Sequence, residues 1–218
     1  MGLVLVFDLD QTLIDSNGLS LSKNQSKENI WNRIGSHLNT KIINEVLKPA
    51  LELRVERKVD AIFLLSNNSG KEYVVNVIHY LALILGVDEP FDYVMIRQHS
   101  SRPQSDNPPK RLEDVKFMMD NTVIPIPYSD DTLANRVYFF DDNTSHEIRK
   151  EIEPDHYIEI QGPDVDPAGR NMGFIAGKPD FSDYREITRV LKSLLTRGGS
   201  RKKTRKIRRK TRKGSRRK

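Results

Sequence analysis

The sequence predicts an α/β fold in which helices cover both faces of a mainly parallel sheet. Short apolar, β-branched runs alternate along the chain with longer segments whose apolar residues recur every three or four positions. The first of these runs, residues 3–7, is apolar without interruption, which is typical of a strand buried on both faces in a parallel sheet. This alternation implies right-handed βαβ units and a Rossmann-like three-layer sandwich.

Five strands and five helices follow from these patterns. The predicted strands are 3–7, 59–65, 93–96, 136–140 and 156–160, and the predicted helices are 28–53, 71–85, 111–119, 145–152 and 182–195. We expect Pro49 to bend or restart the first helix. Ser182 or Asp183 is the expected N-cap of the last helix.

The charge of the chain is divided between two unlike parts. Of 36 Lys and Arg residues, 13 lie in residues 198–218, which contain no Asp or Glu. The remainder holds 23 basic and 30 acidic residues, a net charge of −7. The overall charge of +6 therefore combines an acidic domain, residues 1–196, with a basic tail, residues 197–218. We expect this tail to be disordered when free, because it has almost no apolar residues.

The composition excludes several kinds of site. The chain has no cysteine, so it has no disulfide, thiol nucleophile or cysteine-based zinc site. Its five histidines show no spacing typical of metal ligands. No apolar run approaches the length of a membrane span, and we expect a soluble, intracellular protein without a membrane partner.

Polar clusters follow three of the predicted strands. Asp8 follows the first strand, Ser66 the second and Asp141 the fourth. Ligands of such folds bind beyond the carboxyl ends of the strands, near the point where the strand order reverses. The three clusters are therefore expected to lie together at one edge of the sheet.

The first cluster holds two carboxylates, Asp8 and Asp10, directly after a buried strand. A metal ion can bridge them if Asp10 contributes its backbone carbonyl, which leaves the Asp10 carboxyl group free for acid–base work. Such a pair is also common in solvated turns. The hydrophobic strand before it and the sequence Thr-Leu-Ile-Asp15 after it favour a functional site.

The second and third clusters are weaker when taken alone. The Ser66 hydroxyl and the backbone N–H groups of the following turn, together with Asn67, can bind a phosphoryl oxygen, although a serine after a strand is most often a cap. Asp141 and Asp142 are adjacent acids that repel each other unless a cation lies between them. With Asp8 and Asp10 present, a Mg²⁺ site built from oxygen ligands is preferred to an exposed acidic turn.

Taken together, these residues resemble the motifs of the haloacid dehalogenase (HAD) superfamily. The stretch Asp8-Leu-Asp-Gln-Thr12 is similar to its first motif, D-x-D-x-T. The strand that ends at Ser66 resembles the second motif, and Asp141-Asp142 resembles the fourth. The first motif is specific, the second is weak by itself, and the order of the motifs agrees over residues 2–160.

The resemblance implies a Mg²⁺-dependent phosphatase that forms an aspartyl-phosphate. Asp8 would be the nucleophile, and Asp10 would protonate the leaving oxygen and then deprotonate water. Asp8, the Asp10 carbonyl and Asp141 would hold Mg²⁺, with Asp142 assisting. A second acid two residues after the nucleophile marks phosphatases rather than dehalogenases in this superfamily. Gln11 departs from the commoner glycine, and we expect a more constrained turn there.

The third motif requires a Lys or Arg that reaches the phosphate and Asp8. Lys110, Arg111 and Lys116 are the candidates. Lys110 follows a Pro-Pro turn and matches the placement in the family best, although the spacer to Asp141 contains an unusual insert, 121–135. Residues 16–57 occupy the position where this family places a cap domain. Their length predicts a minimal helical cap or none.

The basic tail predicts a partner of its own. Runs of this kind bind nucleic acids and other polyanions by counterion release, or serve as nuclear localisation signals. In composition, residues 198–218 are similar to the tails of many proteins from large DNA viruses. Two function classes therefore remain: an active HAD-like phosphatase, and a non-catalytic HAD-like scaffold that binds nucleic acid through its tail. A third interpretation combines them in a polynucleotide phosphatase, whose core cleaves a terminal phosphate while the tail holds the strand.

Overall fold

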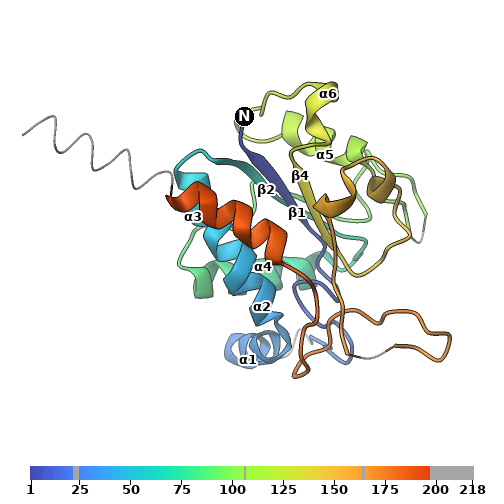
Figure 1. Ribbon diagram of the computed structural model, residues 1–218. Helices are drawn as coiled ribbons and strands as arrows, with labels where there is room; N and C mark the ends of the chain where they lie inside the picture. Colours follow the sequence, from blue (N-terminus) through green and yellow to red (C-terminus); the bar gives the residue numbers. More distant parts are fainter. Residues whose placement is uncertain (22–24, 106, 164, 197–218) are drawn as a thin grey trace, which may run out of the picture.

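A five-stranded sheet forms the centre of the molecule (Figure 1). The computed structural model describes residues 1–21, 25–105, 107–163 and 165–196. The strands have the order β3-β2-β1-β4-β5, and every neighbouring pair is parallel. They are β1 (Leu3–Phe7), β2 (Val59–Leu65), β3 (Tyr93–Met95), β4 (Val137–Asp141) and β5 (Tyr157–Glu159). The predicted α/β fold with a parallel sheet is thus confirmed.

The strand order fixes where a ligand site can form. From β1 the chain adds β2 and β3 on one side, then crosses to place β4 on the other side of β1. The order therefore reverses between β1 and β4. In open parallel sheets the loops that leave the strands at such a point diverge and open a crevice.

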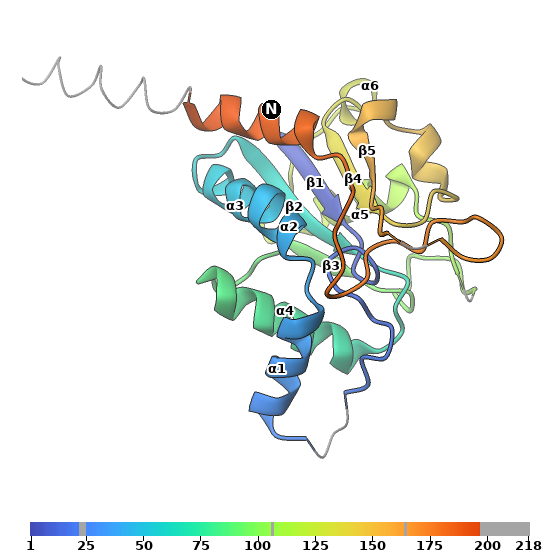
Figure 2. The same ribbon diagram turned by 60° about the horizontal axis from the view of Figure 1, so that its bottom comes forward.

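Helices cover both faces of the sheet, so the fold has three layers (Figures 1 and 2). Leu5, Phe7 and Phe140 contribute to one buried cluster, whereas Val6 and Phe63 contribute to the other, as the alternation of side chains along a strand requires. Helices α3 (Lys48–Val55), α4 (Lys71–Leu85) and 185–196 pack into the first cluster, and α5 (Leu112–Asp120) and α6 (Asp130–Leu133) into the second.

The first predicted helix, 28–53, is interrupted at a different place from the one expected. Helix α1 (Lys27–His37) ends at Leu38, which has extended backbone angles, and Asn39 caps the next helix by accepting a hydrogen bond from the Ile42 N–H. From there α2 (Thr40–Ile42), a π-helical turn η1 (Ile43–Leu47) and α3 are continuous. Pro49 lies in the first turn of α3, one residue after the π-helical turn, where its missing N–H donor is tolerated. The expected change at Pro49 thus appears as a change from π-helix to α-helix, and the break in the chain of helical residues lies earlier, at Leu38.

Residues 16–57, the region considered as a cap, divide between two locations. Helix α3 packs against β2 and is part of the sandwich itself. Helix α1 packs instead against α4, where Trp31 and Tyr80 form a tilted ring pair with centroids 6.3 Å apart. Among the described residues of 16–57, α1 therefore stands apart from the layers that cover the sheet (Figure 2).

The C-terminal part of the domain also differs in detail from the prediction. The last helix spans 185–196, so neither Ser182 nor Asp183 directly precedes it. Asp183 accepts a hydrogen bond from the Arg185 N–H, and Ser182 accepts one from the Gln161 N–H. The predicted helix 145–152 is a short 3-10 helix, η2 (Glu147–Lys150), and a second one, η3 (Pro154–His156), precedes β5.

Two further expectations concern the chain outside the sandwich. The predicted disorder of the basic tail, 197–218, lies outside the described residues. Within the described residues, every helix is too short or too polar to cross a membrane.

Candidate active site

The register of the central strands places two carboxylates side by side. Phe7 of β1 pairs with Phe140 of β4, and the Asp8 N–H donates to the Phe140 carbonyl at 2.9 Å. The next residue on each strand is an aspartate, Asp8 or Asp141. Below them the rings of Phe7 and Phe140 stack with centroids 4.5 Å apart. The sheet thus holds Asp8 and Asp141 together at the point where the strand order reverses.

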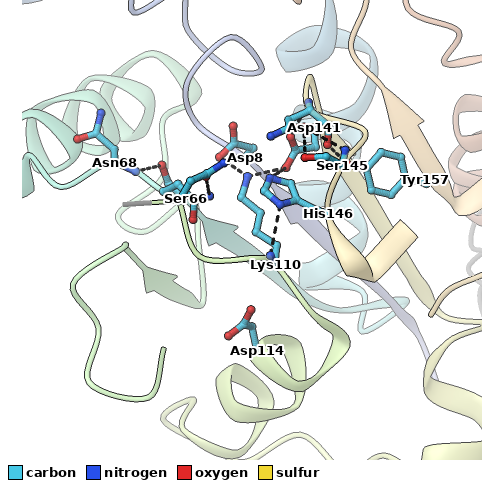
Figure 3. A network of polar contacts seen from close by, with 12 residues as sticks. Asp8, Ser66, Asn68, Lys110, Asp114, Asp141, Ser145, His146 and Tyr157 are labelled. Atoms are coloured by element: carbon cyan, nitrogen blue, oxygen red, sulfur yellow. Dashed lines mark hydrogen bonds and ion pairs between the residues drawn. The ribbon is translucent and has the colours of Figure 1, made fainter. Parts of the chain in front are cut away.

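Lys110 lies between these two carboxylates (Figure 3). Its Nζ is 2.7 Å from Asp8 Oδ1 and 2.5 Å from Asp141 Oδ2. All three side chains are buried, and Lys110 is only 1% exposed. Burial by itself lowers the pKa of Lys110, but the charges of Asp141 and Asp8 outweigh it and raise the pKa above its usual value. Lys110 is therefore a permanent cation inside the site.

A single lysine does not neutralise the site. Asp8, Asp141 and Asp142 each offer a carboxylate oxygen within 4.8 Å of the others. When all three are ionised, Lys110 leaves two negative charges unbalanced. Burial raises the pKa of Asp8 well above its ordinary value, and repulsion by Asp141 and Asp142 adds to this rise against the opposing effect of Lys110. Burial, followed by the charge of Asp141, raises the pKa of Asp142 to about 7.

The surplus charge and the donor set fit a divalent cation. Carboxylate oxygens are the preferred ligands of Mg²⁺, and one such ion would balance the two excess charges. It would also relieve the mutual repulsion that favours the protonated forms of Asp8 and Asp142. Asp8, Asp141 and Asp142 are the residues that would hold it.

Asp10 is held differently from Asp8. One of its carboxylate oxygens, Oδ2, accepts a hydrogen bond of 2.9 Å from the Asn68 side chain. The other, Oδ1, is buried and has no hydrogen-bond partner among the described residues. The chain then turns sharply at Gln11, whose φ of +59° lies in the left-handed region. The constrained turn expected from a non-glycine residue at this position is confirmed.

The residues after β2 do not all face the acids. Ser66 is fully buried, and its Oγ accepts a hydrogen bond of 3.0 Å from the Asn68 N–H, so the hydroxyl stabilises the turn. A hydroxyl that accepts one bond still has a proton to donate. Asn67 donates its side-chain N–H to Asn107 and to the Pro108 carbonyl, and thus contacts the neighbouring loop instead of the acids.

The contacts of Lys110, Arg111 and Lys116 show which of the three candidates for the third motif lies in the site. Only Lys110 reaches the acids of the site. Arg111 pairs with Glu147, and both side chains are nearly half exposed. Lys116 pairs with Glu113 and Asp130 on the outside of α5. Lys110 itself precedes α5, which starts at Leu112, so it is carried by the loop and not by the helix.

Two residues that the sequence did not single out, Asn68 and Arg102, support this arrangement. Asn68 fixes Asp10, as described above. Arg102 is buried and donates to the Ser66 carbonyl at 3.2 Å and to the Pro108 carbonyl at 3.3 Å, so it links the turn after β2 to the loop that carries Lys110. An arginine in a polar, proline-rich loop gives no sequence signal for burial.

His146, close after the acidic pair in sequence, lies beside Lys110 and Asp141. Its Nδ1 accepts a hydrogen bond of 3.4 Å from the Lys110 backbone N–H, and its Nε2 is 3.7 Å from Asp141 Oδ2. Burial lowers the pKa of His146 to about 4, although the charge of Asp141 opposes this shift. The ring is thus neutral at physiological pH, and an accepting Nδ1 places its proton on Nε2, toward Asp141.

Comparison with known proteins adds no family to this description. No family model, no curated protein and no solved structure matched the chain.

Proposed function

We propose that this protein is a Mg²⁺-dependent phosphohydrolase that cleaves a phosphomonoester through an aspartyl-phosphate on Asp8. The observation that carries the proposal is the cluster of buried Asp8, Lys110 and Asp141 with partly buried Asp142, which has two excess negative charges when all three acids are ionised and so matches a divalent cation. A stable core has no need of such a group, because buried charges are expensive. Perturbed carboxylates at the carboxyl ends of parallel strands are typical of active sites.

In the first step, a carboxylate oxygen of Asp8 attacks phosphorus, and the bond from phosphorus to the ester oxygen breaks. The leaving oxygen takes a proton from the Asp10 carboxyl group. Lys110 contacts Asp8 and carries a positive charge, so it is placed to stabilise charge on the transferring phosphoryl group. The products of this step are the free alcohol and the phosphorylated Asp8.

In the second step, water attacks the phosphorus of the aspartyl-phosphate while Asp10 accepts its proton. Inorganic phosphate leaves, and Asp8 returns to its carboxylate form. The unpartnered Oδ1 of Asp10 is the oxygen available for both proton transfers, since Oδ2 is occupied by Asn68. Mg²⁺ held by Asp8, Asp141 and Asp142 would neutralise charge on the phosphoryl oxygens.

Membership in the HAD superfamily is part of the same proposal. It is supported by the D-x-D-x-T stretch at the end of β1, by Ser66 at the end of β2 and by the acid pair at the end of β4. The position of Lys110 between the first and last of these motifs supports it as well. The alternative, a scaffold without activity, leaves the surplus buried charge without a role.

Hydrolysis of p-nitrophenyl phosphate tests the proposal. We expect turnover that requires Mg²⁺ and stops in excess chelator. Acid quenching during turnover should trap one phosphoryl group, located on Asp8 by mass spectrometry. Full activity in chelator, or a phosphoryl group on another residue, contradicts the mechanism. A panel of phosphorylated metabolites, peptides and oligonucleotides would then identify the substrate class.

The basic tail supports a second, separable proposal, binding of nucleic acid or another polyanion. Residues 198–218 carry 13 positive charges, whereas the rest of the chain has a net charge of −7. Deletion of 198–218 should leave turnover of a small phosphate ester nearly unchanged and sharply weaken binding to DNA or RNA. For the intact protein, the logarithm of the affinity should fall linearly with the logarithm of the salt concentration. Unchanged binding after truncation at low salt contradicts this proposal.

A further inference from the structure

The segment between β5 and the last helix lies across both acid-bearing loops. We call residues 171–182 the C-terminal strap; in Figures 1 and 2 it belongs to the orange part of the chain, next to the dark-blue loop after β1. The Phe174 N–H donates to the Gln11 carbonyl at 3.1 Å, and the Ala176 N–H donates to Asp15 Oδ2 at 3.1 Å. The strap is thus bonded to the loop that carries Asp8 and Asp10.

Gly173 is the point at which the strap also reaches the second acid loop. A Cβ atom placed on Gly173 would lie 2.7 Å from the Asp142 Cβ and 3.1 Å from the Gln11 Cβ. Both distances are too short for ordinary carbon contacts. Its φ of +70° is a second reason for glycine, because side chains rarely adopt this conformation. The backbone of Gly173 therefore fills the space between Asp142 and the turn at Gln11.

The strap is held in this position from its other side. A Cβ on Gly162, just after β5, would lie only 1.5 Å from the Gly173 carbonyl oxygen, so the two backbones are in direct contact. Asn171 accepts a hydrogen bond from the Gly173 N–H at 3.0 Å and donates to the Ile160 carbonyl at 3.1 Å. The contacts of Gly173 with Gly162 and Asn171, both tied to the end of β5, therefore hold Gly173 next to Asp142.

The position of Asp142 depends on its contact with Gly173 more than the position of Asp141 does. Asp141 is the last residue of β4 and is fully buried between Lys110 and the sheet, whereas Asp142 lies one residue beyond the strand. The pairing of β1 with β4 ends at Phe7 and Phe140, so it does not reach the Asp142 side chain. Contacts between the loops therefore contribute to the distance of Asp142 from the loop after β1, and Gly173 provides such a contact.

We propose that Gly173 is a positioning residue for the metal site. Gly173 has no side chain, so only its backbone lies between Asp142 and the turn at Gln11. It thereby sets the distance between the carboxylates of Asp142 and Asp8, and this distance affects the affinity for Mg²⁺. This inference rests on the proposed function, because it concerns the same acids. It adds that part of the metal affinity is determined by a segment distant in sequence from every catalytic motif.

The test compares three glycines that lie between β5 and the last helix. Gly169, Gly173 and Gly177 all have a positive φ, but a Cβ on Gly169 or Gly177 would meet nothing within 4 Å. Gly169→Ala and Gly177→Ala therefore reproduce the backbone strain of Gly173→Ala without its contact with Asp142. Binding of Mn²⁺ to the full-length protein, measured by electron paramagnetic resonance, reports the metal site without any substrate. Unfolding in urea reports stability for each variant.

We expect Gly173→Ala to weaken Mn²⁺ binding at least about tenfold, the effect of roughly 1.4 kcal/mol, while the two control variants bind as the wild type does. Asn171→Ala removes the anchor of Gly173 without adding an atom, so it keeps the fold even if Gly173→Ala does not. It should weaken binding by a few fold.

Two results contradict the inference in different ways. If the wild type binds Mn²⁺ and hydrolyses phosphate esters, but Gly173→Ala and Asn171→Ala bind as the controls do, only the positioning role is wrong. If the wild type neither binds Mn²⁺ nor hydrolyses any phosphate ester, the proposed function is wrong and the inference falls with it. Any loss of stability that the three glycine variants share because of their positive φ leaves the interpretation of Mn²⁺ binding unchanged, because binding is measured on folded protein.

Discussion

The site contains two aspartate pairs that are built in different ways. In each pair the first acid, Asp8 or Asp141, lies at the end of a central strand, is buried and contacts Lys110. The second acids, Asp10 and Asp142, are less buried and lie in loops, where Asn68 holds one and Gly173 packs against the other. The first acids are thus placed by the sheet, and the second acids are placed by contacts between loops.

This difference suggests a division of roles between rigid and adjustable groups. The proposed nucleophile Asp8 and the proposed metal ligand Asp141 require fixed positions, which neighbouring parallel strands supply. An acid–base residue has to exchange protons with substrate and water, and a loop position with one free oxygen allows it. The predictions below test this division, starting from the largest expected effect.

Asp8→Asn should abolish hydrolysis and leave the fold intact. The amide is nearly isosteric with the carboxylate but is a poor nucleophile, so turnover of p-nitrophenyl phosphate should fall by at least about a thousandfold. Far-ultraviolet circular dichroism should be unchanged. Turnover within a few fold of the wild type would show that the acid at the end of β1 is not the nucleophile.

Asp10→Asn should slow both chemical steps, because it removes the proton donor and the base. Loss of general acid–base catalysis is expected to cost about a hundredfold to ten-thousandfold. Rapid-quench measurements should show slower formation and slower breakdown of the phosphorylated enzyme. If metal affinity alone fell and single-turnover chemistry survived, Asp10 would belong with the metal ligands, and the division of roles would fail.

Lys110→Met should have the largest effect on stability. It leaves Asp8 and Asp141 buried without their cation, and breaking a buried ion pair costs about 3–5 kcal/mol. The free energy of unfolding in urea, measured in chelator, should fall accordingly. Arg111→Met and Lys116→Met are matched controls, because each residue pairs on the surface, and both should change stability far less. Equal effects of all three would remove the special role of Lys110.

Asn68→Ala should have a smaller effect than Asp10→Asn but act on the same step. It removes the hydrogen bond that holds Asp10 Oδ2, and a hydrogen bond to a charged group contributes roughly 1.5–3 kcal/mol, so kcat should fall about tenfold or somewhat more. The concentration of Mg²⁺ required should stay the same. A change in the Mg²⁺ requirement with unchanged kcat would argue that loop contacts position the metal ligands at this side of the site as well.

The smallest effect is the pH dependence that His146 adds to stability. Its pKa of about 4 in the folded protein is below the usual value of 6.5, so the unfolded chain takes up the proton first as the pH falls. Its contribution to stability is therefore lost between about pH 6.5 and about pH 4. His146→Asn should destabilise the protein less at about pH 5 than at about pH 7.5 in urea unfolding. An equal difference at both pH values would show that the ring is not buried in its neutral form.

The sequence predicted much of the fold because the central strands carry their own signal. A continuous apolar run such as 3–7 favours a strand buried on both faces whatever its neighbours are. Helix 71–85 was predicted with the bounds that α4 has in the structure. The prediction failed for the break in 28–53, because the Asn39 cap and the π-helical turn before Pro49 depend on how the chain packs.

For the site, the sequence by itself determined which strands end in acids and, through the parallel order, that these ends share one edge of the sheet. Tertiary structure decided the rest. It distinguished Lys110 from Arg111 and Lys116, because only the Lys110 side chain lies between Asp8 and Asp141, whereas Arg111 pairs with Glu147 and Lys116 with Asp130. In the tertiary structure Asn68 donates to Asp10, whereas the neighbouring Asn67 donates to the Pro108 carbonyl. It also brought Gly173 against Asp142, a contact between residues distant in sequence that no local pattern encodes.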